Sequence, residues 1–284
     1  MKGNVTLPCG TRPPGRRGLR ARRRITLVTS DDELGAPASA PSIRSWSTWR
    51  HALRHALVLG ALWIVYTIGR AVAGRHIGRA FPNSDDVWHF ERWLHIPSEA
   101  SLQRWALHWE PGIRAADLYY KYVHFTDFVL VTAWLLLWHP EHFLWFRRVI
   151  VSITGLELVG HFVYPLAPPR MRPDLGMADT AQLFGHAVYG GSYENHGLFN
   201  QYAAMPSMHV GWSFLFAIAV VRIARSPWRW IIVLHPLLMT YVVVVTGNHY
   251  WLDGIIGLIL LAIGLWLFRR DSPWRKPLET EAHT

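Results

Sequence analysis

The fold is decided by apolar blocks such as HALRHALVLGALWIVYTIGRAVA (residues 51–73) and LDGIIGLILLAIGLWLF (residues 252–268). Each is close to the ~20 residues that an α-helix needs to cross the hydrocarbon of a bilayer. Similar blocks occur at residues 115–138, 149–165, 206–223 and 230–247. The sequence therefore predicts an all-α, polytopic membrane protein with six transmembrane helices.

This prediction rests on where the apolar residues lie along the chain, because the overall composition does not distinguish a membrane protein from a soluble one. The 284-residue chain is 51% hydrophobic, which a soluble domain could also reach. Between the first two blocks, residues 85–110 combine charged side chains with four tryptophans. That pattern is typical of a helix lying along the membrane surface. The tryptophans are Trp88, Trp93, Trp105 and Trp109.

The charge is concentrated outside the apolar blocks. Of the net charge of +10, residues 1–50 contribute +7, from ten Lys or Arg and three acids. Such an arm could bind nucleic acid, but beside a membrane helix it favours attachment to anionic lipid, with no nucleic-acid partner. The predicted organisation is a disordered basic cytoplasmic tail (1–48), a membrane domain (49–270) and a second cytoplasmic tail (271–284). The lone Cys9 provides neither a disulfide framework nor a thiolate metal site.

Loop charge predicts the orientation. With six alternating spans, the basic tail, Arg147-Arg148, the 222–229 arginines and the basic segment 269–276 fall on one side. The excess of Lys and Arg makes that side cytoplasmic, with both termini there. The opposite side, facing away from the cytoplasm, then receives the end of the third span, the start of the fourth, and the turn between the fifth and sixth.

Two unusual motifs occur at these outer positions. Residues 205–209 (MPSMH) open the fourth span, where Pro206 suits the first helical position and the free N–H groups form an anion site beside His209. Residues 246–253 (TGNHYWLD) join the last two spans and place His249 four residues before Asp253. On a helix these two share a face, so the carboxylate can orient the imidazole for attack.

Each motif alone has an ordinary explanation, since a histidine at a helix end is usually a satisfied polar residue. Together on one membrane face, with a Pro-Pro-Arg element at residues 168–170, they favour a catalytic site. A non-enzymatic scaffold, the least favoured alternative, would not need His209, His249 and Asp253 on one face.

These motifs resemble a known family. Pro206-Ser207-Met208-His209 and His249-x-x-x-Asp253 look like the signatures of the type-2 phosphatidic acid phosphatase superfamily. Three longer strings are similar to the branch of the inositol phosphorylceramide synthases, the aureobasidin targets, and related actinobacterial membrane proteins. These strings are APPR (167–170), NQYAAMPSMH (200–209) and TGNHY (246–250). The resemblance covers roughly residues 50–270.

The resemblance implies a role for each matching residue. His249 would be the nucleophile that forms a phosphohistidine, with Asp253 orienting it, and His209 the general acid and then base. Arg170 would bind phosphate oxygens as a fork. No metal or other cofactor is expected, because side-chain cations and helix-end amides stabilise the phosphoryl charge. The remaining candidate substrate-binding residues are Ser207, Asn248, Asn200 and Lys121.

The sequence also departs from the family pattern. Pro165 occupies the position of an expected Lys, seven residues before Arg172-Pro173, and Val243 that of an Arg six residues before the nucleophile. Lys121 is a hypothetical replacement for the missing charge, although a simple Lys121–Asp117 pair would explain it equally well. Ionisable residues at membrane depth are costly and usually functional.

The predicted function is metal-independent phosphoryl transfer on a membrane lipid, of the head-group phosphotransferase type found in inositol phosphorylceramide synthases. The alternative is a hydrolase acting on a lipid phosphate or polyprenyl pyrophosphate. Both share the chemistry up to the phosphoenzyme and differ in whether the acceptor pocket excludes water. Residues 166–202 could form a lid over that pocket or an exposed loop. The partners are the lipid substrate and the bilayer, and the sequence leaves the oligomeric state open.

Overall fold

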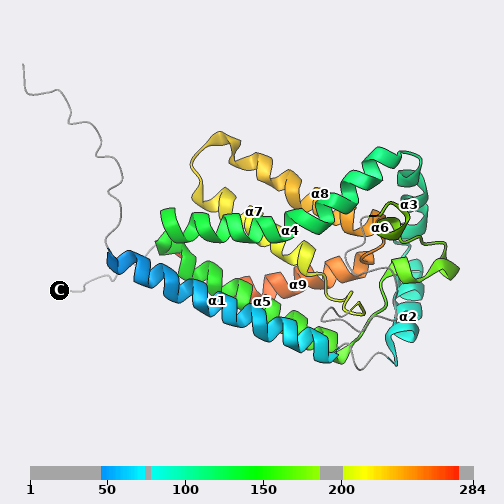
Figure 1. The fold of residues 1–284 in the computed structure, drawn as a ribbon, viewed down its shortest axis with the longest axis horizontal. Coiled ribbons are helices and arrows are strands. Elements are labelled where there is room, and N and C mark those ends of the chain that lie inside the picture. Colours follow the sequence, from blue (N-terminus) through cyan, green and yellow to red (C-terminus); the bar gives the residue numbers. More distant parts are fainter. Residues whose placement is uncertain (1–45, 74–77, 186–200, 275–284) are drawn as a thin grey trace, which may run out of the picture. The chain divides into compact units, whose positions relative to one another are not determined.

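A computed structural model describes residues 46–73, 78–185 and 201–274 (Figure 1). Its longer helices are α1 (Trp46–Ala73), α2 (Ala80–Trp93), α3 (Glu99–Leu107), α4 (Glu110–Trp138), α5 (Pro140–Val163), α7 (Met208–Ile223), α8 (Leu234–Val245) and α9 (Trp251–Leu267). The short ones are η1 (Pro169–Met171), η2 (Pro173–Leu175), α6 (Thr180–Leu183) and η3 (Pro227–Val233). The described residues contain no strand, which confirms the all-α prediction.

The apolar core lies between the long helices. Helix α7 packs against α8 and α9, α5 packs against α9, and α1 packs against α5. Small residues allow the closest approaches: a Cβ at Gly257 of α9 would lie 2.6 Å from the Ser207 carbonyl oxygen, and one at Gly264 would lie 2.8 Å from Ile153. Gly257 thus allows α9 to approach the start of α7, and Gly264 allows α9 to approach α5.

Two stretches are long and apolar enough to cross a membrane, Leu53–Ala73 in α1 and Pro227–Val245 in η3 and α8. Helices α7 and α9 are equally apolar in character but shorter. Helices α4 and α5 are longer, and they contain buried ionisable side chains such as Asp117 and Glu157. Six spans therefore remain a prediction, supported by apolarity at two of them.

The segment 85–110 is helical as predicted, but in two helices instead of one. Helices α2 and α3 are separated by a turn in which His95 has a φ of 57°. Figure 1 shows them across the end of the bundle at which α9 begins. Their tryptophans Trp93 and Trp105 are 71% and 67% exposed, whereas Glu91 and Glu99 are fully buried. The two helices therefore present aromatic groups outward and carboxyl groups to the bundle.

The other end of the bundle is basic. Arg147 of α5 lies 2.6 Å from the His55 ring of α1, and Arg148 pairs with Asp271 at 2.8 Å. Arg222, in the last turn of α7, packs over the Trp274 ring. The start of α1, the start of α5 and the ends of α7 and α9 thus meet at one end, as the alternation of spans requires.

Candidate active site

His249 and Asp253 lie together at the start of α9. Their Nδ1 and Oδ2 atoms are 3.3 Å apart, and the same Oδ2 accepts a hydrogen bond from the Tyr250 N–H at 2.9 Å. Asp253 is fully buried and His249 is 5% exposed. Because α9 begins only at Trp251, the two residues meet around the helix start and do not share one helical turn.

The partners of Nδ1 fix the tautomer of His249. This atom also lies 2.7 Å from the carbonyl oxygen of Ala204. A carbonyl and a carboxylate can only accept hydrogen bonds, so Nδ1 carries the proton and Nε2 keeps its lone pair. Burial, aided by the nearby cations of Arg170 and Arg70, lowers the pKa of His249 to about 3. The imidazole is therefore neutral near pH 7 and can act as a nucleophile.

The MPSMH motif is joined to this pair through the backbone. The Ser207 N–H donates to the Asp253 carbonyl oxygen at 2.9 Å. The Ser207 side chain caps α7 by accepting from the Val210 N–H, so α7 begins at Met208. Pro206 therefore precedes the helix cap, and its prediction as the first helical residue is wrong. Serine is a favoured N-cap residue because its hydroxyl satisfies a free N–H.

His209 lies across from His249, with 5.6 Å between the ring centroids. Its ring stacks on Tyr120 at 4.4 Å and lies 4.2 Å from the ring of His124, both residues of α4. His124 in turn stacks on Trp212. The aromatic contacts hold the His209 imidazole so that both histidines can face the same small group.

Arg170 is held beside the turn that carries His249. Its Nη1 donates to Asn248 Oδ1 at 2.6 Å, its backbone N–H donates to the Gly247 carbonyl at 2.7 Å, and its Nε lies 3.8 Å from Asp179. Gly247 has a φ of +68°, and a Cβ there would lie 3.1–3.3 Å from Arg170 atoms. Glycine is therefore required for this approach.

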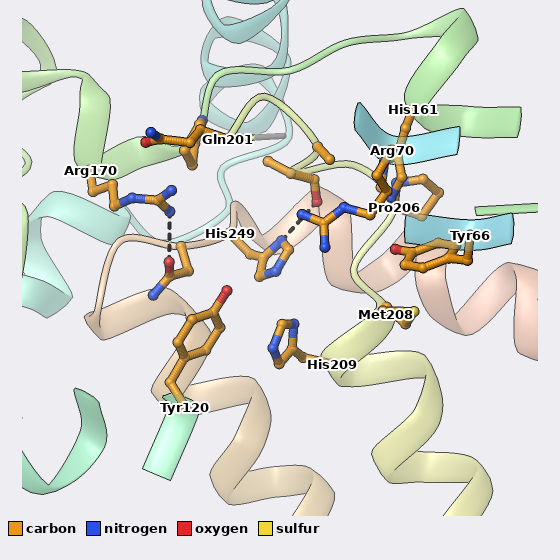
Figure 2. Close-up of a pocket in the computed structure, with 14 residues that line it drawn as sticks. Tyr66, Arg70, Tyr120, His161, Arg170, Gln201, Pro206, Met208, His209 and His249 are labelled. Carbon is orange, nitrogen blue, oxygen red and sulfur yellow. Dashed lines mark hydrogen bonds between the residues drawn. The ribbon is translucent and has the colours of Figure 1, made fainter. Parts of the chain in front are cut away.

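These groups enclose a cavity of about 40 Å³ (Figure 2). One water needs ~10–15 Å³ by this measure, so a small tetrahedral anion is a suitable occupant. In Figure 2 the side chains of Arg70 and Arg170 enter from opposite sides of His249. The remaining lining residues include Tyr66, Tyr120, His161, Gln201, Asn248 and His209.

The structure brings most of the predicted site residues together, but not all. Arg170, Asn248, His209 and His249 line the cavity; Asp253 and Ser207 support it. Lys121 is not among the lining residues, and its Nζ lies 5.4 Å from the centroid of the Tyr122 ring. Asn200 lies outside the described residues, as does the 186–200 part of the possible lid. Residues 166–185 include the buried Arg170 and the two 3-10 helices η1 and η2.

Sequence reasoning missed four groups at the cavity. Arg70 and Tyr66 come from α1, and Tyr120 from α4. His161 of α5, whose Nδ1 donates to the Met205 carbonyl at 2.9 Å, supports the segment before α7. No local signal in the sequence connected Arg70 to residues so distant in the chain.

The described part of the chain contains no cluster of three His, Cys, Asp or Glu side chains suited to a metal ion. Asp117, the proposed partner of Lys121, accepts a hydrogen bond from Thr180 at 2.7 Å. The positive side chains that line the cavity are the guanidiniums of Arg70 and Arg170, and guanidiniums suit phosphate oxygens.

The sequence profile of the PAP2 superfamily matches residues 85–267. The chain belongs to the PAP2 superfamily. No curated protein and no solved structure gives a significant match. Membership of the superfamily indicates phosphatase or phosphotransferase activity, and so an enzyme. The matched region runs from α2 through α9 and leaves α1, which carries Arg70, outside it.

Proposed function

We propose that this PAP2 superfamily protein is a membrane lipid phosphotransferase that works through a phosphohistidine at His249. One observation carries the proposal: His249 Nδ1 is held by two acceptors, which leaves Nε2 free, across a phosphate-sized cavity from His209. Arg170 at the same cavity supplies charge for phosphoryl oxygens. We propose Asn248, Ser207 and Asn200 as further contacts of the substrate.

In the first step, His249 Nε2 attacks the phosphorus and the bond from phosphorus to the leaving oxygen breaks. His209 in its protonated form gives that oxygen its proton, and Asp253 stabilises the charge that develops on the His249 ring. In the second step, an acceptor hydroxyl gives its proton to His209 and attacks phosphorus, and the nitrogen–phosphorus bond breaks. Neither step needs a divalent cation, so chelators should leave the rate unchanged.

A phospholipid head-group transferase of the inositol phosphorylceramide synthase type is the form we favour. The strings at residues 167–170, 200–209 and 246–250 resemble that branch, and Pro165 and Val243 replace two cations of the general phosphatase pattern. The alternative acceptor is water, which would make the protein a lipid phosphate or polyprenyl pyrophosphate phosphatase.

We propose that the chain is an integral protein of the cell membrane with six spans. The exposed apolar side chains of α1 support a lipid environment, since Trp63, Val65 and Ile68 are each more than half exposed. The basic groups gather at the end opposite the site. The positive-inside rule then places both termini in the cytoplasm and the site on the extracytoplasmic side.

The experiment that tests the function is lipid mass spectrometry on purified protein in vesicles that contain a head-group-labelled phospholipid and a lipid alcohol. A transferase moves the labelled phosphoryl head group onto the lipid alcohol and releases diacylglycerol. A hydrolase releases the label into water and leaves the lipid alcohol unmodified. His249→Ala protein serves as the control and should give neither product.

Sidedness is tested with single cysteines in a Cys9→Ser background. Leu183 in α6 is exposed at the site end, and Ser226 is exposed between α7 and η3. Leu183→Cys should react with an impermeant maleimide in intact cells, and Ser226→Cys only after lysis. Labelling of both positions from the same side would contradict the six-span arrangement.

A further inference from the structure

The cavity needs more positive charge than the recognised motifs provide. A phosphodiester becomes more negative on its oxygens as the transfer proceeds, and a low-dielectric site must supply matching cations. Two motif positions that would carry cations hold Pro165 and Val243. Of the motif arginines, Arg170 lines the cavity with its Nε 3.8 Å from Asp179, whereas Arg172 pairs with Asp85 and Asp174.

Arg70 is placed to make up part of this difference. It lies in the last turn of α1, where the negative end of the helix dipole favours a cation. Tyr66, one turn earlier, also lines the cavity, and its ring centroid is 5.8 Å from the Arg70 guanidinium carbon. The side chain therefore extends along an aromatic surface into the cavity.

Helix α1 reaches the site because it packs closely on α5. A Cβ at Gly69 would lie 2.7 Å from a δ-carbon of Leu158, so the end of the Leu158 side chain packs directly on Gly69. His161, one turn after Leu158 on α5, lines the same cavity as Arg70. The packing of α1 on α5 thus determines how far the guanidinium projects.

Arg70 and the His249 imidazole line the same cavity, so the charge of Arg70 acts on that ring. Burial is the main cause of the lowered pKa of His249, and the charges of Arg170 and then Arg70 add to it. Figure 2 shows the two arginines on opposite sides of the ring. Phosphoryl oxygens bonded through phosphorus to Nε2 would have a guanidinium on each side.

We propose that Arg70, from a helix outside the region that defines the family, binds the phosphoryl oxygens opposite Arg170 and replaces charge missing from the motifs. The inference rests on the proposed phosphohistidine chemistry at His249. It assigns the anion-binding site to α1 as well as to the superfamily region, and it makes the substrate a lipid whose phosphate, not its chain, contacts α1 at this point.

The test compares Arg70→Ala, Arg70→Lys and the control Arg54→Ala in full-length protein. Arg54 lies on the exposed face of the same helix, near its other end. Three quantities are measured: kcat/KM for lipid phosphoryl transfer, the concentration of orthovanadate that inhibits by half, and the rate of phosphoenzyme formation. Added guanidinium ion is used to rescue Arg70→Ala, with tetramethylammonium as the matched cation.

Arg70→Ala should lower kcat/KM by about 10²–10³-fold, the usual effect of losing one donor to transition-state charge. It should weaken vanadate inhibition, and guanidinium should restore part of the rate while tetramethylammonium does not. Arg70→Lys should retain an intermediate rate, because it keeps the charge without the fork. Arg54→Ala should match wild type.

Unchanged vanadate inhibition and phosphoenzyme formation in Arg70→Ala would overturn the inference. The inference would also be overturned if guanidinium failed to restore the rate of Arg70→Ala and the variant unfolded at a clearly lower temperature than wild type. The residue would then be structural. Failure of the proposed function is distinguishable, since wild type would then form no phosphoenzyme at His249 at all.

Discussion

Helix α1 and the α7–α9 region form two sides of the same cavity but are held in different ways. In α7–α9, the Ser207 N–H bonds to the Asp253 carbonyl, and Asp253 is fully buried. Helix α1 packs through side chains on α5 and leaves large apolar groups such as Val65 exposed by 60%. The α7–α9 side of the cavity is thus held by a backbone hydrogen bond, whereas the α1 side is held only by side-chain packing.

The difference separates two tasks. The groups that exchange protons and form the covalent bond lie on segments joined by this backbone hydrogen bond, and a small misplacement of such groups is costly to the rate. In our proposal Arg70 binds the phosphoryl oxygens from a helix at the periphery, and its attraction for them falls off only gradually with distance. Changes to the reacting groups of α7–α9 should therefore lower activity more than changes in α1.

Among variants that keep the His249 nucleophile, the largest expected loss comes from Asp253→Asn. The amide could still accept the Tyr250 N–H, but it cannot stabilise the imidazolium and can impose the wrong tautomer on His249. We expect kcat to fall by about 10⁴-fold, as for the orienting carboxylate of a serine protease. Steady-state kinetics on folded protein measure this. A near-normal rate would make Asp253 a structural cap.

Substitution of one glycine in each region, Gly257 in α9 and Gly69 in α1, compares the two regions directly. A Cβ at Gly257 would lie 2.6 Å from the Ser207 backbone oxygen, and one at Gly69 2.7 Å from the flexible end of Leu158. Gly257→Ala should destabilise by about 1–3 kcal/mol and greatly reduce activity, since backbone must shift. Gly69→Ala should be nearly neutral, because Leu158 can move and alanine favours the helix. Thermal unfolding and kcat for both variants measure the contrast; equal effects would remove it.

The start of α9 is also bonded to Glu91, a buried carboxyl group of α2. Glu91 Oε1 accepts the Leu252 N–H at 2.7 Å. Burial, the neighbouring Glu99 and, more weakly, Asp253 raise the pKa of Glu91 to about 9, while Arg92 lies 3.5 Å from its other oxygen. Glu91 therefore contributes its full share to the stability of the folded protein below about pH 4.5, and this share is lost as the pH rises towards 9.

Glu91→Gln should remove this pH dependence, because the amide keeps the bond to Leu252 and does not titrate. Between pH 6 and pH 10, we expect the variant to gain about 1–3 kcal/mol of stability relative to wild type. Unfolding midpoints at the two pH values measure it. Parallel pH profiles for wild type and variant would exclude a role for this proton.

The smallest effect is expected from Lys121→Met. Lys121 is the alternative source of the missing charge, but its Nζ lies near Tyr122 and the residue does not line the cavity. We expect kcat/KM and vanadate inhibition to change by less than about twofold, within the usual effect of an isolated surface charge. A loss equal to that of Arg70→Ala would transfer the phosphate-binding role to Lys121.

The sequence predicted what depends on neighbours along the chain. The helical class followed from the apolar blocks, and the spacing of His249 and Asp253 predicted that they would meet. Pro206 was predicted as the first residue of α7, but the helix begins two residues later, at Met208, because Ser207 is the N-cap. Lys121 was the hypothetical source of the missing charge, and Arg70 was not considered because nothing near it in the sequence marks it.

The contribution of α1 could not be predicted in this way. Arg70 meets His249 only because α1 packs on α5 and α5 on α9, which is a property of the tertiary structure. An arginine in the last turn of an apolar helix is also typical of a simple helix end. The same limit applies to Glu91, whose bond to Leu252 joins residues far apart in the chain.

The central claim is that His249 becomes phosphorylated during turnover. Wild-type and His249→Ala proteins are mixed with phospholipid labelled at phosphorus, quenched in base during turnover, digested and analysed by mass spectrometry. Wild type should carry an acid-labile, base-stable phosphoryl group on the peptide that contains His249, and the variant should carry none and be inactive. Substantial turnover by His249→Ala, or a label on a different residue, would contradict the account.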